Sequence, residues 1–160
     1  MNKIWTLLFL MGTMVSCTKE PATLNVTSPS GINAIDFHLS EDGTPYYLVR
    51  HGEKTVIDSS AMGFDFKDQE PLKSGLNLVS STQNTLNETW EMPWGEQREV
   101  VNHYNEMVVT LEESAAPNRQ FNIYFRAYDD GIGFRYEFLP QQGRDSIIIM
   151  DENTEFQLTE

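Results

Sequence analysis

Apolar and polar residues alternate with a period of two along much of this chain, and this pattern constrains its fold most strongly. Residues 35–39, 107–111 and 121–127 each place an apolar side chain at every second position. Successive side chains of a strand point to opposite faces, so such segments form strands with one buried and one solvent-facing side. No helical periodicity persists over a window of a dozen residues. The sequence therefore predicts an all-β chain.

Turn-forming residues separate these segments at short intervals. Asp129-Asp130-Gly131 lies between two strand-like segments and predicts a tight hairpin, and residues 41–45 predict another turn. Short strands joined in this way favour two antiparallel sheets packed face to face, a β-sandwich. We interpret the apolar run 147–150 as a strand covered on both faces, and residues 69–97 as the least regular part of the chain, containing long loops. Residues 155–160 read as a strand still in progress, so we expect the sandwich to be incomplete at its C-terminus.

The first 16 residues resemble an export signal, because Lys3 precedes an apolar segment too short to span a bilayer core. Small residues then lead into Cys17, the single cysteine of the chain, as in bacterial lipoproteins. After cleavage Cys17 would carry several acyl chains, which together anchor a protein stably. We expect a signal peptide over residues 1–16, lipidation at Cys17, a tether over 17–22 and a folded domain over 23–160. An ordinary secretory signal with an incidental cysteine is the alternative.

Acidic residues outnumber basic ones by 24 to 11, so the formal net charge is −13. Nucleic-acid binding requires a surplus of Lys and Arg to neutralise phosphates, so we expect no nucleic-acid partner. Electrostatic docking on anionic lipid is disfavoured for the same reason. The lipid anchor would then be the contact with the membrane.

A glycosidase needs two carboxylates about 5–9.5 Å apart on either side of the scissile bond. Five glutamates cluster in one stretch: Glu88, Glu91, Glu96, Glu99 and Glu106. Sequence alone cannot place two of them across a sugar, and solvated carboxylates are common in an acidic protein. The sequence contains no Gly-x-Ser-x-Gly elbow, no Gly-rich phosphate loop and no histidine spacing typical of a metal site. We assign no catalytic and no metal-binding residue.

Residues 90–96 carry two tryptophans beside carboxylates. Tryptophan faces stack on the C–H faces of sugars, while carboxylates accept hydrogen bonds from hydroxyl groups. The alternative is a tryptophan buried in the core with its N–H satisfied. We expect Trp90 in the core and leave Trp94 open between the two roles. The candidate carbohydrate-proximal residues are Trp94, Glu96 and His103, which is the one histidine in a dense polar cluster.

Four segments, in this order, resemble a known family: Ser28-Pro29-Ser30-Gly31, residues 90–96, Asn102-His103-Tyr104-Asn105-Glu106 and residues 125–137. Together they resemble the N-terminal domain of glycoside hydrolase family 97, over about residues 23–160. The resemblance implies a galactose-mutarotase-like β-super-sandwich, followed in complete members by a (β/α)₈ barrel and a small C-terminal β-domain. It also implies dependence on Ca²⁺, with the catalytic acids and most calcium ligands on the barrel. No catalytic or calcium-binding residue of the family maps onto this sequence, so we expect no hydrolysis by this chain alone.

The resemblance implies the N-terminal, carbohydrate-associated domain of a calcium-dependent α-glucosidase or α-galactosidase, which packs on a barrel and helps to close its sugar site. Its partners would be an α-linked oligosaccharide, through the complete enzyme, and the membrane, through the anchor. The alternative is an envelope-anchored carbohydrate-binding or interaction β-sandwich without hydrolytic activity. Either protein would be exported and lipid-anchored in the cell envelope of a Gram-negative bacterium.

Overall fold

The computed structural model describes residues 23–140 and 146–160, and within them the chain forms strands and no helix. Cys17 and the expected signal and tether lie outside the described residues. The strands are Leu24–Thr27 (β1), Asn33–Leu39 (β2), Pro45–His51 (β3), Lys54–Ala61 (β4), Phe64–Phe66 (β5), Gln69–Leu72 (β6), Leu76–Glu91 (β7), Glu99–Glu113 (β8), Gln120–Tyr128 (β9), Gly131–Phe138 (β10), Ile149–Glu152 (β11) and Gln157–Leu158 (β12).

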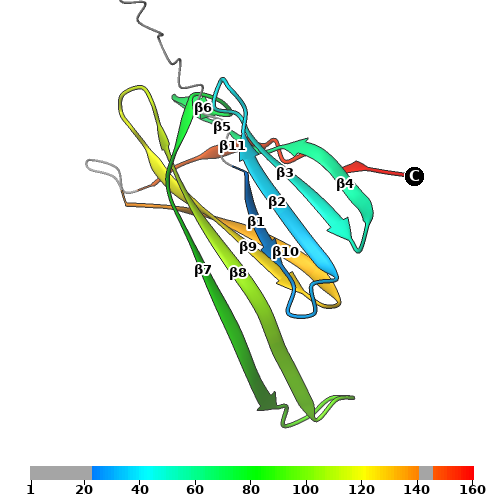
Figure 1. The fold of residues 1–160 in the computed structure, drawn as a ribbon. Coiled ribbons are helices and arrows are strands. Elements are labelled where there is room, and N and C mark those ends of the chain that lie inside the picture. Colours follow the sequence, from blue (N-terminus) through cyan, green and yellow to red (C-terminus); the bar gives the residue numbers. More distant parts are fainter. Residues whose placement is uncertain (1–22, 141–145) are drawn as a thin grey trace, which may run out of the picture.

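The strands form three antiparallel sheets (Figure 1). A five-stranded sheet has the order β1-β2-β3-β4-β12, and a four-stranded sheet has the order β10-β9-β8-β7. A small sheet, β11-β5-β6, lies at one end of the other two. The five- and four-stranded sheets pack face to face, which confirms the predicted sandwich-like all-β fold.

The core lies between the two large sheets and is built by the alternation seen in the sequence. Every second residue of β9 is buried, and Phe125 of that strand packs against Phe37 of β2 with 5.6 Å between ring centroids. The fully buried side chains include Ile35, Phe37, Tyr47, Met107, Val109, Leu111, Ile123 and Phe125. The Asp129-Asp130-Gly131 hairpin is also confirmed, because β9 and β10 pair from Gly131↔Tyr128 to Phe138↔Phe121.

The prediction of long loops over residues 69–97 is wrong. Most of this stretch belongs to β6 and to the 16-residue strand β7, which pairs with β8 from Leu76↔Glu113 to Glu91↔Glu99. The polar residues of β7 face solvent on both sides along most of its length, so the strand has no alternation to detect. Trp90 lies on this exposed stretch and is 43% exposed, so the expectation of a core tryptophan is also wrong.

The prediction that residues 147–150 form a strand covered on both faces is wrong as well. These four apolar side chains are exposed, and β11 pairs only with β5 in the small sheet. After β11 the chain leaves the small sheet. Its last strand, β12, pairs with β4 and forms the edge of the five-stranded sheet. The buried hydroxyl of Tyr47 donates to the carbonyl of Glu155 (2.7 Å) and fixes this part of the chain. Among the described ranges, no helix is long and apolar enough to cross a membrane.

Candidate functional site

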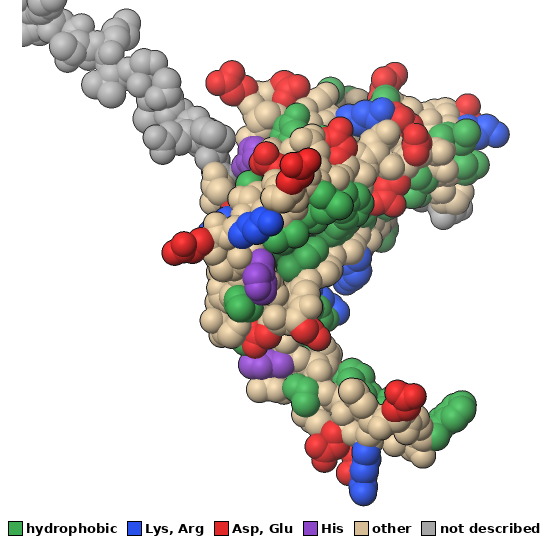
Figure 2. Space-filling view, turned by 90° about the vertical axis from the view of Figure 1, so that its right-hand side faces the viewer, with side chains coloured by type: hydrophobic (Ala, Val, Ile, Leu, Met, Phe, Trp, Pro, Cys, Tyr) green, Lys and Arg blue, Asp and Glu red, His purple; other side chains and the backbone are tan. Residues whose placement is uncertain are grey.

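The hairpin formed by β7 and β8 extends well beyond the sandwich (Figure 1). Strand β8 has β9 as a second neighbour only from Tyr104 onward, where Tyr104 pairs with Tyr128. Residues 87–103 therefore form a two-stranded projection, which we call the arm. Figure 2 shows the arm leaving the body as a narrow hook with acidic side chains along it.

At the base of the arm, the β1–β2 connection holds the β9–β10 turn. The carboxylate of Asp129 accepts hydrogen bonds from the backbone N–H of Ser30 (2.9 Å) and from its hydroxyl (2.7 Å). These bonds hold the pKa of Asp129 below its usual value, and the nearby imidazole of His103 acts in the same direction. We call this meeting point of the two turns and β8 the junction.

A buried asparagine completes the junction. The side-chain amide of Asn33 donates to the carbonyls of Tyr128 (2.8 Å) and Asp129 (3.1 Å). Its carbonyl oxygen lies 2.7 Å from Nδ1 of His51 on β3. The β9–β10 turn is thus fixed to two strands of the opposite sheet.

An aromatic and ionic cluster fixes the outer face of β8 at the same level. The rings of Tyr104 and Tyr128 lie 5.0 Å apart, and the guanidinium of Arg126 lies over Tyr104 at 4.4 Å. Arg126 also donates to the carboxylate of Glu106 (2.7 Å). Three of the four segments that resemble the family therefore meet at the junction, and the fourth forms the outer end of the arm.

A shallow hollow opens at the junction and is lined by Val101, His103, Tyr128, Asp129 and Asp130. Its imidazole, phenol and carboxylates can exchange hydrogen bonds with a polar ligand. The Asp129 carboxylate is already engaged by Ser30, so the other polar groups of the hollow are the imidazole of His103, the phenol of Tyr128 and the carboxylate of Asp130.

The structure separates the three candidate carbohydrate-proximal residues. Trp94 and Glu96 lie in the exposed connection at the tip of the arm, where Trp94 is 84% exposed. His103 pairs with Asn87, four residue pairs farther from the tip than Glu91↔Glu99. The hollow therefore contains His103 without Trp94 and Glu96, and a sugar contact by any of the three stays a prediction.

The clustered glutamates are mostly engaged with neighbouring side chains. Glu88 accepts a hydrogen bond from Asn102 (2.9 Å), and Glu106 binds Arg126 as described above. Glu91 pairs with Arg98 (3.4 Å) and lies directly opposite Glu99 on the exposed arm. In the part of the chain that the structure describes, no three His, Cys, Asp or Glu side chains are grouped to hold a metal ion. These residues therefore do not fit the calcium site that the resemblance implies for the complete enzyme.

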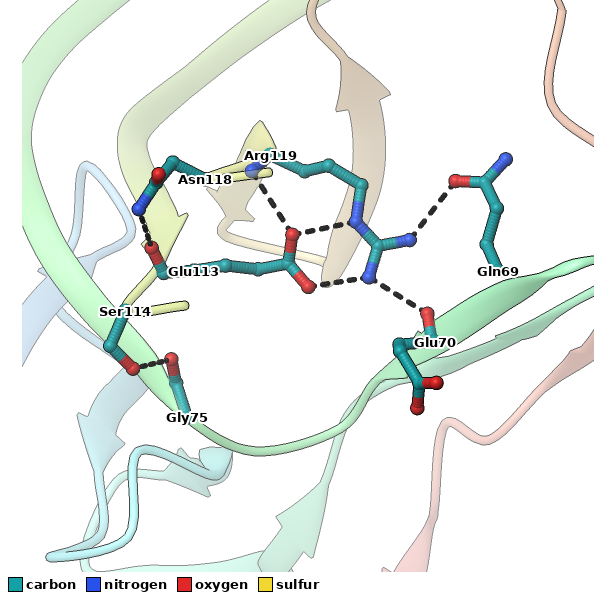
Figure 3. Close-up of polar contacts among 7 residues, drawn as sticks. All are labelled: Gln69, Glu70, Gly75, Glu113, Ser114, Asn118 and Arg119. Carbon is teal, nitrogen blue, oxygen red and sulfur yellow. Dashed lines mark hydrogen bonds and ion pairs between the residues drawn. The ribbon is translucent and has the colours of Figure 1, made fainter. Parts of the chain in front are cut away.

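Sequence reasoning missed a buried arginine, Arg119, in the β8–β9 connection (Figure 3). Its guanidinium binds both carboxylate oxygens of Glu113, donates to the carbonyl of Glu70 (2.7 Å) and reaches the side-chain oxygen of Gln69 (3.1 Å). Burial raises the pKa of Glu113, but the hydrogen bonds and charge of Arg119 outweigh it, so the pKa lies below its usual value. No sequence pattern pointed to Arg119, because its partners on β6 lie about 50 residues away.

Comparison with known proteins gives one family. A sequence profile described as Glycosyl-hydrolase 97 N-terminal matches residues 26–160. A Glycoside Hydrolase Family 97 enzyme from Pseudoalteromonas sp. strain K8, solved in complexes with panose and with acarbose, is 37% identical with a TM-score of 0.79. The match covers 84% of this chain and 20% of that enzyme. A β-arabinopyranosidase is 22% identical with a TM-score of 0.77 over 86% of this chain and 21% of its own, which supports the fold alone.

Proposed function

This chain belongs to glycoside hydrolase family 97, as its N-terminal domain, and from this membership we propose that it is the carbohydrate-associated scaffold of an α-glycosidase. In this proposal the domain packs on a catalytic (β/α)₈ barrel and helps to close its sugar site. The substrate is an α-glucoside or an α-galactoside. The bond-breaking acids belong to the barrel rather than to these 160 residues.

One observation carries the proposal: the domain matches about a fifth of the length of family 97 enzymes that were solved with panose and with acarbose. The described residues support a scaffold role, because their clustered glutamates are bound to neighbours or lie on the exposed arm. Calcium dependence is part of the proposal for the complete enzyme, with the ligands supplied outside this domain.

A domain exchange tests this function in a complete enzyme. In the Pseudoalteromonas enzyme, the segment aligned with residues 26–160 is replaced by those residues of this chain. We expect the chimera to hydrolyse an aryl α-glucoside and to lose activity when calcium is chelated. A chimera that folds, as judged by a cooperative thermal transition, but shows no hydrolysis would contradict the proposal.

We further propose that the protein is exported and anchored in the envelope of a Gram-negative bacterium through lipids on Cys17. The sequence of residues 1–17 supports this placement. In a bacterial host, the wild-type chain should sediment with membranes and incorporate labelled palmitate. Cys17→Ser should abolish the labelling, and a chain that remains labelled after this substitution would disprove the anchor.

A second candidate function, a carbohydrate-binding module without hydrolysis, is supported by the exposed indole of Trp94 beside Glu96. Titration calorimetry of the full chain with panose tests it. Binding that Trp94→Ala removes would favour the module, whereas no heat of binding at millimolar panose would exclude it.

A further inference from the structure

We propose that the arm, residues 87–103, is the element by which this domain docks on the catalytic part of a family 97 enzyme. This inference rests on the proposed function and deepens it by naming the contact surface and the chemistry of its partner. The partner surface is an apolar recess bordered by Lys and Arg.

The first observation is that nothing in the described part of the chain covers the outer part of the arm, beyond the hollow at its base where Val101 and His103 lie beside the β9–β10 turn. Five strand pairs, from His103↔Asn87 to Glu99↔Glu91, extend past the last residue that β9 contacts on β8. Five residues of strand span about 17 Å, and a two-stranded hairpin of this kind is only marginally stable in water. The described body gains no core from the outer part of the arm, so the packing that orders the arm comes from protein outside the described residues.

The second observation is the composition of the arm. Four large apolar side chains, Trp90, Met92, Trp94 and Val101, are exposed on it, at 42–84%. Tryptophan and methionine are enriched at protein interfaces, and tryptophan is among the commonest residues to carry most of the binding energy. Exposed tryptophans gathered on a projection are therefore best explained by a protein surface that receives them.

The third observation is how these side chains are arranged. Trp90 lies directly opposite Val100, so the two share one face of the hairpin. Val101 lies on the other face, because neighbouring residues of a strand point in opposite directions. Both faces therefore offer apolar contacts, as expected for an arm inserted between surfaces.

The fourth observation is charge. The arm carries four carboxylates, Glu88, Glu91, Glu96 and Glu99, against the single guanidinium of Arg98, so its net charge is 1 − 4 = −3. Glu91 and Glu99 oppose each other directly, which is unfavourable unless cations lie nearby. The guanidinium of Arg98 lies 3.4 Å from the carboxylate of Glu91. Basic residues on the partner would complete this pairing, which is why we assign them to the rim of the recess.

The partner is assigned from the comparisons. The matched family 97 enzymes are about five times as long as this segment, so they contain a large protein surface joined to this domain. A free sugar would need one aromatic platform with nearby polar groups, and would leave the apolar contacts on the opposite face of the arm unexplained.

The test uses the chimeric enzyme described above, with three variants. The first joins Leu86 to Tyr104 by an Asn-Gly turn, which removes the arm while keeping a two-residue hairpin connection. The second combines Trp90→Ala and Trp94→Ala. The control is Val79→Ala, an exposed apolar residue at the body end of β7.

We expect the first two variants to lose at least about tenfold in kcat/KM and to melt at a lower temperature than the parent chimera, with Val79→Ala unchanged. If the parent chimera is active and the armless variant keeps its full activity and melting temperature, the inference is overturned. The proposed function would remain intact in that case. A rise in KM for long oligosaccharides alone, with an unchanged melting temperature, would instead make the arm a sugar-binding element and overturn docking.

If the chimera does not fold, the full chain is mixed with the Pseudoalteromonas enzyme lacking the aligned segment, and binding is measured by sedimentation. Binding that the armless variant loses and Val79→Ala retains supports the inference. Binding that survives loss of the arm, or no binding at all, overturns it.

Discussion

Among the described residues, Arg119 and Glu113 form the most buried ion pair, with side chains only 4% and 12% exposed. The guanidinium meets the carboxylate with two nitrogens and also binds β6, so one residue joins the β8–β9 connection to the small sheet. A charge left behind in such a place costs more than the pair itself contributes, because the remaining carboxylate is largely shielded from water and has lost its partner.

Arg119→Met should therefore lower the free energy of unfolding by about 3–5 kcal/mol. Arg98→Met is the matched control, because its pair with Glu91 is 80% and 63% exposed and should contribute about 1 kcal/mol or less. Urea unfolding of the two variants measures both values. Equal losses of unfolding free energy in the two variants would show that burial does not determine how much an ion pair stabilises the domain.

Carboxylates with lowered pKa values determine how the stability responds to acid. The pKa of Asp129 is lowered by the hydrogen bonds from Ser30, and that of Glu137 by hydrogen bonds from Tyr124 and Asn122. Both carboxyl groups are ionised in the folded and unfolded states at neutral pH. Their full contribution to the free energy of unfolding is therefore present at that pH. It is lost as pH falls below the unfolded pKa of about 4 and through the lower folded value.

The melting temperature should accordingly change little between about pH 7 and pH 5 on account of these groups and fall below about pH 4. Asp129→Asn should make this fall shallower, because one of the linked protonations is removed. Asp130→Asn is the control, because it removes a neighbouring exposed carboxylate and leaves the hydrogen bonds between Ser30 and Asp129 in place. If the melting temperature of Asp129→Asn fell with pH as steeply as that of the wild type, the role given to the junction would be contradicted.

At the scale of elements, the arm is a two-stranded hairpin whose contact with the described body is confined to its base, where Val101 and His103 line the hollow at the junction. Replacing residues 87–103 by an Asn-Gly turn should therefore shift the melting temperature of the isolated chain by no more than about 3 °C. The hydrogen bonds of Asn33 and Asp129 and the ring contact of Tyr104 remain in this variant, whereas Val101 and His103 of the hollow are removed. A loss of more than about 8 °C would mean that the arm stabilises the body.

Strands whose inner faces form the core were predictable from sequence, and the others were not. Phe121, Ile123 and Phe125 alternate with polar residues because one side of β9 meets the opposite sheet. Strand β7 has solvent on both sides along the arm, so no burial imposes a pattern on its Thr and Asn residues. The run at 147–150 is apolar and yet exposed, and a pattern of hydrophobicity cannot separate that case from a buried strand.

The candidate site was predictable as residue types but not as an arrangement. The segments containing Ser30 and Asp129 were both noted in the sequence, but their hydrogen bond joins residues 99 positions apart. Only the packing of one sheet on the other brings them together. The separation of His103 from Trp94 depends in turn on the length of β7, which the sequence pattern did not reveal.

At the scale of the whole molecule, the domain consists of a packed sandwich, a junction that fixes its turns and an arm that leaves the body (Figure 1). The polar groups of the junction bind one another, and the carboxylates of the arm lie in solvent. Catalysis of glycoside hydrolysis requires two carboxylates held on either side of a sugar. In the function we propose, this chain is therefore the part of the enzyme that positions and docks.

The most direct test of that claim is the rate at which the purified chain hydrolyses an aryl α-glucoside, with and without calcium. We expect a rate no higher than that of buffer, while the chimera carrying the same residues turns over substrate. Hydrolysis by the chain alone at rates typical of enzymes, about 1 s⁻¹ or more, would contradict it.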